Sequence, residues 1–120
     1  MPKPKGYLTT HILDTANGSP ADNVRIDLFR LEGNDRTHLK TVVTNKDGRT
    51  DAPVLPEGEM TVGQYELVFA IGDYFRARRQ SVGVAFIDEV PIRFGIGDQN
   101  DHYHVPLLVS PFSFSTYRGS

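Results

Sequence analysis

Short apolar and β-branched runs, each ended by turn-forming residues, fill most of the 120-residue chain. This pattern predicts strands near residues 7–14, 23–31, 38–45, 49–54, 64–71, 88–96, 102–110 and 112–118. Clusters of Gly, Pro, Asn and Asp separate the runs, as in Asn17-Gly18-Ser19-Pro20 and Asp47-Gly48. Seven or eight short strands at this spacing are typical of an antiparallel β-sandwich.

One segment departs from the strand pattern. Asp73 can cap a short helix over residues 74–80, and Ser81-Val82-Gly83 would end it. The three arginines of this segment could form an anion-binding patch, but a run of like charges on a helix is more often a solvated face. We therefore expect one short, charged helix beside the strands.

The composition excludes several classes of function. With 13 basic and 15 acidic residues, the formal net charge of −2 gives no bulk attraction to nucleic acid or to an anionic membrane. The chain has no cysteine, so disulfides, thiolate metal ligands and a cysteine nucleophile are excluded. No apolar run approaches the ~20 residues that span a bilayer. We expect a single domain over residues 1–120, with residues 1–6 as a flexible N-terminal tail.

The start of the chain bears on its location in the cell. The basic residues of the first six positions are not followed by the apolar stretch of a secretory signal. A cytoplasmic protein is therefore expected, with the peroxisome and the periplasm as alternatives.

Histidine titrates nearest to physiological pH, so the four histidines are the first candidates for catalysis. Between Tyr103 and Val109 the odd-numbered residues are all apolar, which predicts that they face the core. His102, His104 and Pro106 would then share the opposite face of that strand. A histidine on such a face also has an ordinary role as a hydrogen-bonded polar residue.

The other two histidines are less constrained by alternation. His11 shares a mixed face with Tyr7, Thr9 and Leu13, so this face could point inward or outward. His38 begins a strand and is expected to be exposed. The His-x-His pair could bind zinc, but no acidic ligand has an obvious place beside it. We therefore expect no metal and no cofactor.

Three stretches and the end of the chain resemble the 5-hydroxyisourate hydrolases of the transthyretin-like family. The stretches are residues 8–15 with 18–21, residues 44–50 and residues 102–111, and the ending is Tyr-Arg-Gly-Ser. The resemblance implies a transthyretin-like two-sheet antiparallel β-sandwich with one short helix. It also implies a homotetramer, a dimer of dimers, whose active sites lie in the channel where the dimers meet.

The resemblance also assigns roles to individual residues. It implies that His11, Arg49 and His104 are catalytic and that Tyr117, Arg118, Gly119 and Ser120 complete the site by binding substrate. His102 belongs to the same motif, and we expect it to bind substrate or to orient a neighbour.

The implied reaction is hydrolytic opening of the cyclic amide of 5-hydroxyisourate, a product of urate oxidation. Water needs a neutral imidazole to accept its proton, and either His11 or His104 could be that base. The developing oxyanion needs a fixed cation, such as Arg49 or Arg118.

A small-ligand carrier like transthyretin is the alternative to the hydrolase. In that carrier, the positions matching His11, Arg49 and His104 hold Lys, Glu and Thr, and the Tyr-Arg-Gly-Ser ending is missing. At all these positions this chain has the enzyme's residues.

Overall fold

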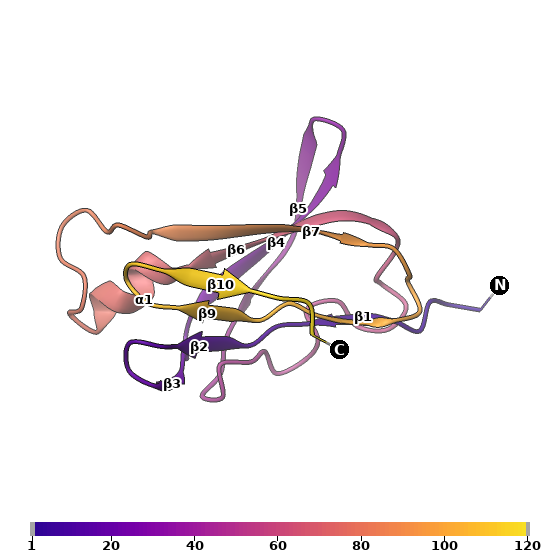
Figure 1. Cartoon of the computed structure of the whole chain (residues 1–120). Coiled ribbons are helices and arrows are strands. Elements are labelled where there is room, and N and C mark those ends of the chain that lie inside the picture. Colours follow the sequence, from indigo (N-terminus) through magenta and orange to yellow (C-terminus); the bar gives the residue numbers. More distant parts are fainter. Residues whose placement is uncertain (1, 120) are drawn as a thin grey trace.

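The computed structural model describes residues 2–119, which form two β-layers with a helix at one end (Figure 1). The elements are β1 (Tyr7–Thr9), β2 (Ile12–Asp14), β3 (Ser19–Pro20), β4 (Arg25–Glu32), β5 (Asp35–Val43), β6 (Gly63–Ala70), α1 (Ile71–Ala77), β7 (Glu89–Ile96), β8 (His102–His104), β9 (Leu107–Val109) and β10 (Phe114–Thr116). The expectation of an all-β fold with one short helix is confirmed for the described part of the chain.

The first layer is an antiparallel sheet of four strands in the order β5-β4-β6-β7. Its β4–β5 hairpin extends away from the body of the molecule (Figure 1). Arg30 and Tyr65 face each other across the β4–β6 pair, and the arginine donates a 2.6 Å hydrogen bond to the tyrosine hydroxyl. This layer supplies the buried side chains Leu28, Leu67 and Phe69 to the core.

The second layer combines the sheet β10-β9-β2-β3 with the pair β1-β8. β1 leads into β2 and β8 leads into β9, each across a two-residue interruption. Backbone hydrogen bonds continue the pairing across the interruptions, from Val105 N to Thr9 O (3.0 Å) and from Leu107 N to His11 O (2.8 Å). The two pairs therefore act as one layer, which covers the core with Leu8, Ile12, Leu107 and Val109.

This second layer corrects the expectation of a purely antiparallel sandwich. β1 pairs with β8 in parallel, and so does β2 with β9. Parallel neighbours need a long connection between them, and here the whole first layer and the helix lie between the paired strands in sequence. Alternating polarity indicates which face of a strand is buried, but it does not reveal the direction of the neighbouring strand.

Several predicted element boundaries were wrong. Residues 49–54 form no strand, and only Leu55 makes a β-bridge, to Leu8. The predicted strand 102–110 divides at Val105-Pro106, because proline has no N–H to donate to a ladder. The predicted strand 7–14 divides at the same level of the sheet. Pro106 itself is buried, although alternation assigned it to the outer face.

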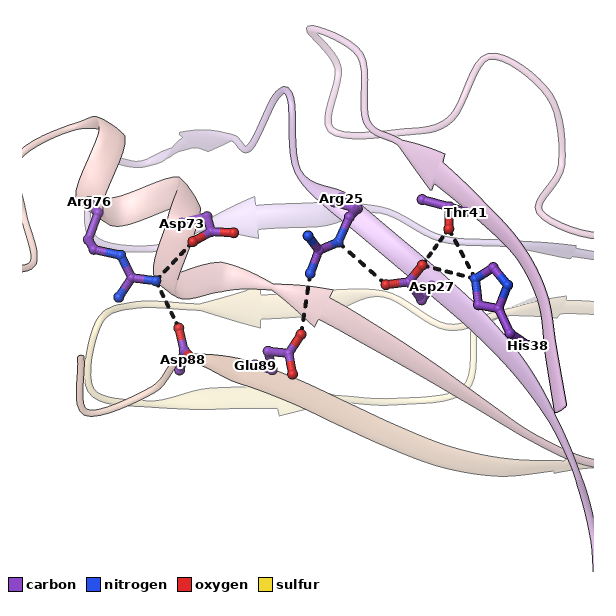
Figure 2. A network of polar contacts seen from close by, with 8 residues as sticks. All are labelled: Arg25, Asp27, His38, Thr41, Asp73, Arg76, Asp88 and Glu89. Carbon is purple, nitrogen blue, oxygen red and sulfur yellow. Dashed lines mark hydrogen bonds and ion pairs between the residues drawn. The ribbon is translucent and has the colours of Figure 1, made fainter. Parts of the chain in front are cut away.

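The helix begins earlier than predicted because β6 runs directly into it. α1 starts at Ile71, and within residues 2–119 no side chain caps its first turn. Asp73 instead accepts a 2.9 Å hydrogen bond from Arg76, which also donates to Asp88 at 3.0 Å (Figure 2). Arg78 donates to Asp22 at 2.9 Å. Arg76, Arg78 and Arg79 are all exposed, and the first two pair with carboxylates, so the prediction of a solvated face is confirmed.

The start of the chain contacts the body of the sandwich. Gly58 N donates to Pro4 O (3.0 Å), and the buried Gly6 donates its N–H to Gln99 O (2.9 Å). The flexible tail over residues 1–6 stays a prediction. In the part of the chain that the structure describes, the helix is too short and too polar to cross a membrane.

Candidate active site

The parallel register of β1 and β8 builds one side of the candidate site. Tyr7 lies opposite His102, and Thr9 lies opposite His104. These four side chains are half-buried on the outer face of the layer, whereas Leu8 and Tyr103 between them are buried in the core. The alternation prediction for His102 and His104 is therefore confirmed, and the mixed face of the first strand points outward.

Thr9 connects the two histidines of β8. Its Oγ1 lies 2.7 Å from His102 Nε2 and 2.8 Å from His104 Nδ1. The His102 ring also stacks on Tyr7, with ring centroids 4.2 Å apart and planes at 13°. One nitrogen of each imidazole is thus held by the same hydroxyl.

A tight turn brings Arg49 to this face of the layer. The Asn45 side-chain carbonyl accepts a 2.9 Å hydrogen bond from Asp47 N, and Gly48 N donates to Asn45 O at 2.9 Å. Gly48 O in turn accepts the N–H of Ile12 at 2.8 Å. The turn is therefore fixed to the interruption between β1 and β2, the segment that carries His11.

Only glycine fits at the point of contact between this turn and the strand. Gly48 has φ +73°, and a Cβ there would lie 2.5 Å from Ile12 O. The turn predicted at Asp47-Gly48 is present, and its tight contact positions the next residue, Arg49.

These elements surround an open pocket of about 400 Å³. Its lining combines the β1 and β8 side chains with the irregular segment after the turn: Thr9, Thr10, Arg49, Thr50, Asp51, Ala52, Pro53, His102 and His104. Of the predicted catalytic residues, Arg49 and His104 line this pocket.

His11 does not line this pocket, but it interacts electrostatically with Arg49 and His104. Burial lowers the pKa of both His11 and His104, and the positive charge of Arg49 lowers each pKa further. His102 and His11 also contribute to the lowered pKa of His104. Both imidazoles are therefore neutral at neutral pH and lie near a guanidinium that keeps its charge. This combination can accept a proton and stabilise developing negative charge.

The end of the chain reaches His104 through its backbone. Gly119 N donates to His104 O at 2.7 Å, and a Cβ on Gly119 would lie 2.8 Å from His104 Cδ2. The Tyr117 and Arg118 side chains instead line a separate hollow of about 230 Å³. There Arg118 donates to Asp101 at 2.8 Å and lies 4.2 Å from the centroid of the Tyr103 ring.

The structure thus brings His104, His102 and Arg49 into one pocket, with Gly119 against His104. It places the Tyr117 and Arg118 side chains in a different hollow of the same chain. The predicted role of Ser120 lies outside the described residues.

Thr9 and the segment 50–53 line the pocket although the sequence did not single them out as site residues. The sequence offered one signal for Thr9, its place on the same strand face as His11. Its contact with His104 depends on the parallel register, which a single sequence does not reveal. The sequence pattern predicts a strand over residues 49–54, and a strand there would not form the rim of a pocket.

His38 is exposed on β5, as predicted. Its Nε2 lies 3.1 Å from Asp27 Oδ1 and 3.0 Å from Thr41 Oγ1, while Arg25 contacts the other oxygen of Asp27 (Figure 2). Both contacts use the same ring nitrogen, so they form a surface polar cluster and not a proton relay. Within residues 2–119, no three His, Cys, Asp or Glu side chains converge as they would around a metal ion.

Two layers of strands, with neutral imidazoles and an arginine on the outer face of one layer, define a β-sandwich protein with a site suited to hydrolysis. The sequence profile of the HIUase/transthyretin family matches residues 8–119. The chain belongs to this family. It is 59% identical to the 5-hydroxyisourate hydrolase of Mesorhizobium japonicum over 96% of this chain and 93% of that protein. It is 53% identical to the 5-hydroxyisourate hydrolase of Pseudomonas aeruginosa, over 99% and 95% of the two chains.

Solved structures show the same fold. The Klebsiella pneumoniae 5-hydroxyisourate hydrolase superposes with a TM-score of 0.79 at 36% identity, covering 95% of this chain and 99% of that one. Sea bream transthyretin in complex with thyroxine gives 0.83 at 25% identity, covering 93% of each chain. An (S)-allantoin synthase gives 0.92 at 51% identity, and 98% of this chain matches 45% of that chain. The transthyretin-like sandwich expected from the sequence is confirmed.

Proposed function

We propose that this chain hydrolyses 5-hydroxyisourate, opening its cyclic amide to 2-oxo-4-hydroxy-4-carboxy-5-ureidoimidazoline. The observation that carries the proposal is the meeting of Arg49 and His104 in one pocket. It occurs in a chain that matches 5-hydroxyisourate hydrolases at 53–59% identity over almost its whole length.

The chemistry follows from the protonation states. A neutral imidazole, that of His11 or His104, accepts a proton as a water oxygen bonds to the amide carbonyl carbon. The Arg49 guanidinium stabilises the resulting oxyanion. When the carbon–nitrogen bond breaks, the imidazolium returns the proton to the leaving nitrogen. The cycle leaves the enzyme unchanged and uses only side chains of the protein.

Substrate binding is part of the same proposal. Arg49 offers a planar set of donors to a carbonyl-rich ring, and His102 lies beside it in the pocket. We assign substrate binding also to Tyr117, Arg118, Gly119 and Ser120. The contact of Gly119 with His104 supports a place for the end of the chain at the site.

A homotetramer, a dimer of dimers, completes the proposed site. The Tyr117 and Arg118 side chains lie outside the histidine pocket of their own chain. Within that pocket His102 and His104 are only half-buried, and Arg49 is exposed. A second subunit over this face would shield the pocket from bulk solvent and bring those residues to the substrate. The cytoplasmic location expected from the sequence belongs to this proposal too.

The test is decay of freshly made 5-hydroxyisourate, generated from urate by urate oxidase, with spontaneous decay subtracted. The protein should accelerate decay in proportion to its concentration. His104→Asn and Arg49→Glu should each lower turnover by roughly a hundredfold or more, because each removes a group that acts in the transition state. Both variants should keep the size of the parent protein in gel filtration.

The matched control is His38→Asn, which changes the exposed histidine of β5. It should leave turnover unchanged. A correctly folded tetramer without acceleration would contradict the hydrolase and favour the ligand carrier. Full activity in His104→Asn or Arg49→Glu would remove that residue from the site.

A further inference from the structure

Thr9 occupies a position that no catalytic role above explains. Its single hydroxyl lies within hydrogen-bond distance of His102 Nε2 (2.7 Å) and His104 Nδ1 (2.8 Å). The three residues come from two parallel strands that pair in register, so the backbone of the layer holds them together. Thr9 also lines the pocket with both histidines.

A hydroxyl carries one proton, so it can donate to only one of the two rings. If Thr9 donates to His104 Nδ1, a neutral His104 carries its proton on Nε2 and cannot accept another there. If Thr9 donates to His102, it accepts Nδ1–H from His104, and Nε2 of His104 keeps its lone pair. Of these two arrangements, only the second leaves the Nε2 lone pair of His104 free to accept a proton.

The second arrangement also persists through the reaction. A protonated His104 carries hydrogen on both nitrogens, so its Nδ1 must donate to Thr9. A threonine that already accepts from Nδ1 needs no reorientation when Nε2 takes up the proton. In this arrangement the His102 ring accepts the hydrogen bond from the Thr9 hydroxyl. Stacking on Tyr7 holds that ring in place.

We propose that Thr9 is a positioning residue that, together with His102, holds His104 in the Nδ1–H tautomer and so makes Nε2 of His104 the general base. This inference rests on the proposed hydrolytic function. In the step itself, the water O–H bond breaks, the oxygen bonds to the carbonyl carbon, and the proton goes to His104 Nε2. No proton crosses Thr9, whose part is to orient the ring.

The experiment compares Thr9→Val, which keeps the shape of the side chain and removes the hydroxyl, with Thr9→Ser, which keeps the hydroxyl. Thr9→Val should lower kcat about ten- to a hundredfold, as expected for one lost hydrogen bond to a group that becomes charged, with KM changed less than about threefold. Thr9→Ser should recover most of the lost kcat. Thr37→Val, at an exposed position of β5, is the matched control and should behave as the parent protein.

A second readout does not depend on turnover. In protein labelled with ¹⁵N-histidine, long-range ¹H–¹⁵N correlation spectra report which nitrogen of each neutral ring carries the proton. His104 should show Nδ1–H in the parent protein and in Thr9→Ser, and a mixture of tautomers in Thr9→Val. Arg49, His11 and His102 should be left unchanged in all the labelled proteins, because the charges of these groups lower the pKa of His104.

His102→Phe provides an independent variant in case Thr9→Val does not fold. Phenylalanine can keep the stack on Tyr7 but has no acceptor for the Thr9 hydroxyl. It should lower kcat, and the double variant His102→Phe/Thr9→Val should be no slower than Thr9→Val alone, since both changes break one chain of hydrogen bonds.

The inference is overturned if Thr9→Val keeps the parent kcat and the Nδ1–H tautomer, or if the losses of the two single variants multiply in the double variant. A parent protein without turnover would instead refute the proposed hydrolase. The tautomer spectra would still decide whether Thr9 holds His104 in this state.

Discussion

Arg49 affects the site through its fixed charge as well as through its donors. It contributes to the lowered pKa of His11 and of His104, second only to burial in each case. In the proposed reaction, a cation beside the base has two effects: it favours the neutral imidazole that can accept a proton, and it stabilises the negative charge of the oxyanion. Arg49 therefore affects both the pKa of the two histidines and the proposed stabilisation of the oxyanion.

This link predicts a shift in pH dependence. The active form of the base is neutral, so turnover falls as pH drops through the pKa of the base, which lies below its ordinary 6.5. Arg49→Met removes the charge and should raise that pKa. The acid limb of kcat/KM for the remaining activity should then move to higher pH. Titration of the His11 and His104 ring signals by NMR should show the same direction.

Arg79→Met, at an exposed position after α1, is the control and should leave both curves in place. An acid limb that stays where it is, or moves to lower pH in Arg49→Met, would mean that Arg49 does not set the protonation of the base.

Residue-scale features were only partly readable in the sequence. Alternation correctly placed His102 and His104 on the outer face, because Tyr103 and its alternate neighbours are apolar. The contact of Thr9 with His104 could not be predicted, since the two residues lie 95 positions apart in the chain. Spacing within one strand shows which side chains share a face and not what lies opposite them.

At the scale of elements, the interruptions in the strands of the second layer help to place the site residues. The break between β1 and β2 holds His11, and directly after it Ile12 N, at the start of β2, donates to Gly48 O in the turn that carries Arg49. The strands were predictable from their apolar runs. The break between β8 and β9 has a signal in the sequence, Pro106, which cannot donate to a ladder. The break between β1 and β2 has no such residue, and the turn that docks beside it comes from a distant part of the chain.

The docked turn gives a prediction about stability. Gly48→Ala places a methyl group 2.5 Å from Ile12 O at a positive φ, so it should cost about 3 kcal/mol or more. Gly33→Ala has a similar φ of +59° and nothing within 4 Å, so it should cost only about 1 kcal/mol. Thermal unfolding at equal protein concentration measures both.

Gly48→Ala should also lose turnover, because the turn positions Arg49, whereas Gly33→Ala should keep it. Equal destabilisation by the two alanines would show that the backbone conformation, and not the contact with Ile12, makes glycine necessary at position 48.

At the scale of the whole molecule, the topology gathers the site from distant parts of the chain. The parallel pairs β1–β8 and β2–β9 join the first strands to the last ones, while the antiparallel layer between them in sequence forms the other wall of the core. The sandwich could be predicted from the number and spacing of its strands. The side-by-side placement of its two ends could not, because it needs the strand order.

That placement predicts different effects of tags at the two ends. The C-terminal segment is fixed to the site by the bond from Gly119 N to His104 O, whereas the chain before β1 lies at the end of the sandwich opposite α1 (Figure 1). A peptide tag joined after Ser120 has to pass beside His104 and should lower turnover much more than the same tag joined before Met1. Kinetics of the two tagged forms, and of the C-terminally tagged form after proteolytic removal of the tag, measure the difference. Equal turnover of the two tagged forms would mean that the end of the chain takes no part in the site. Recovery of turnover after the tag is removed would show that the tag obstructs the site without unfolding the protein.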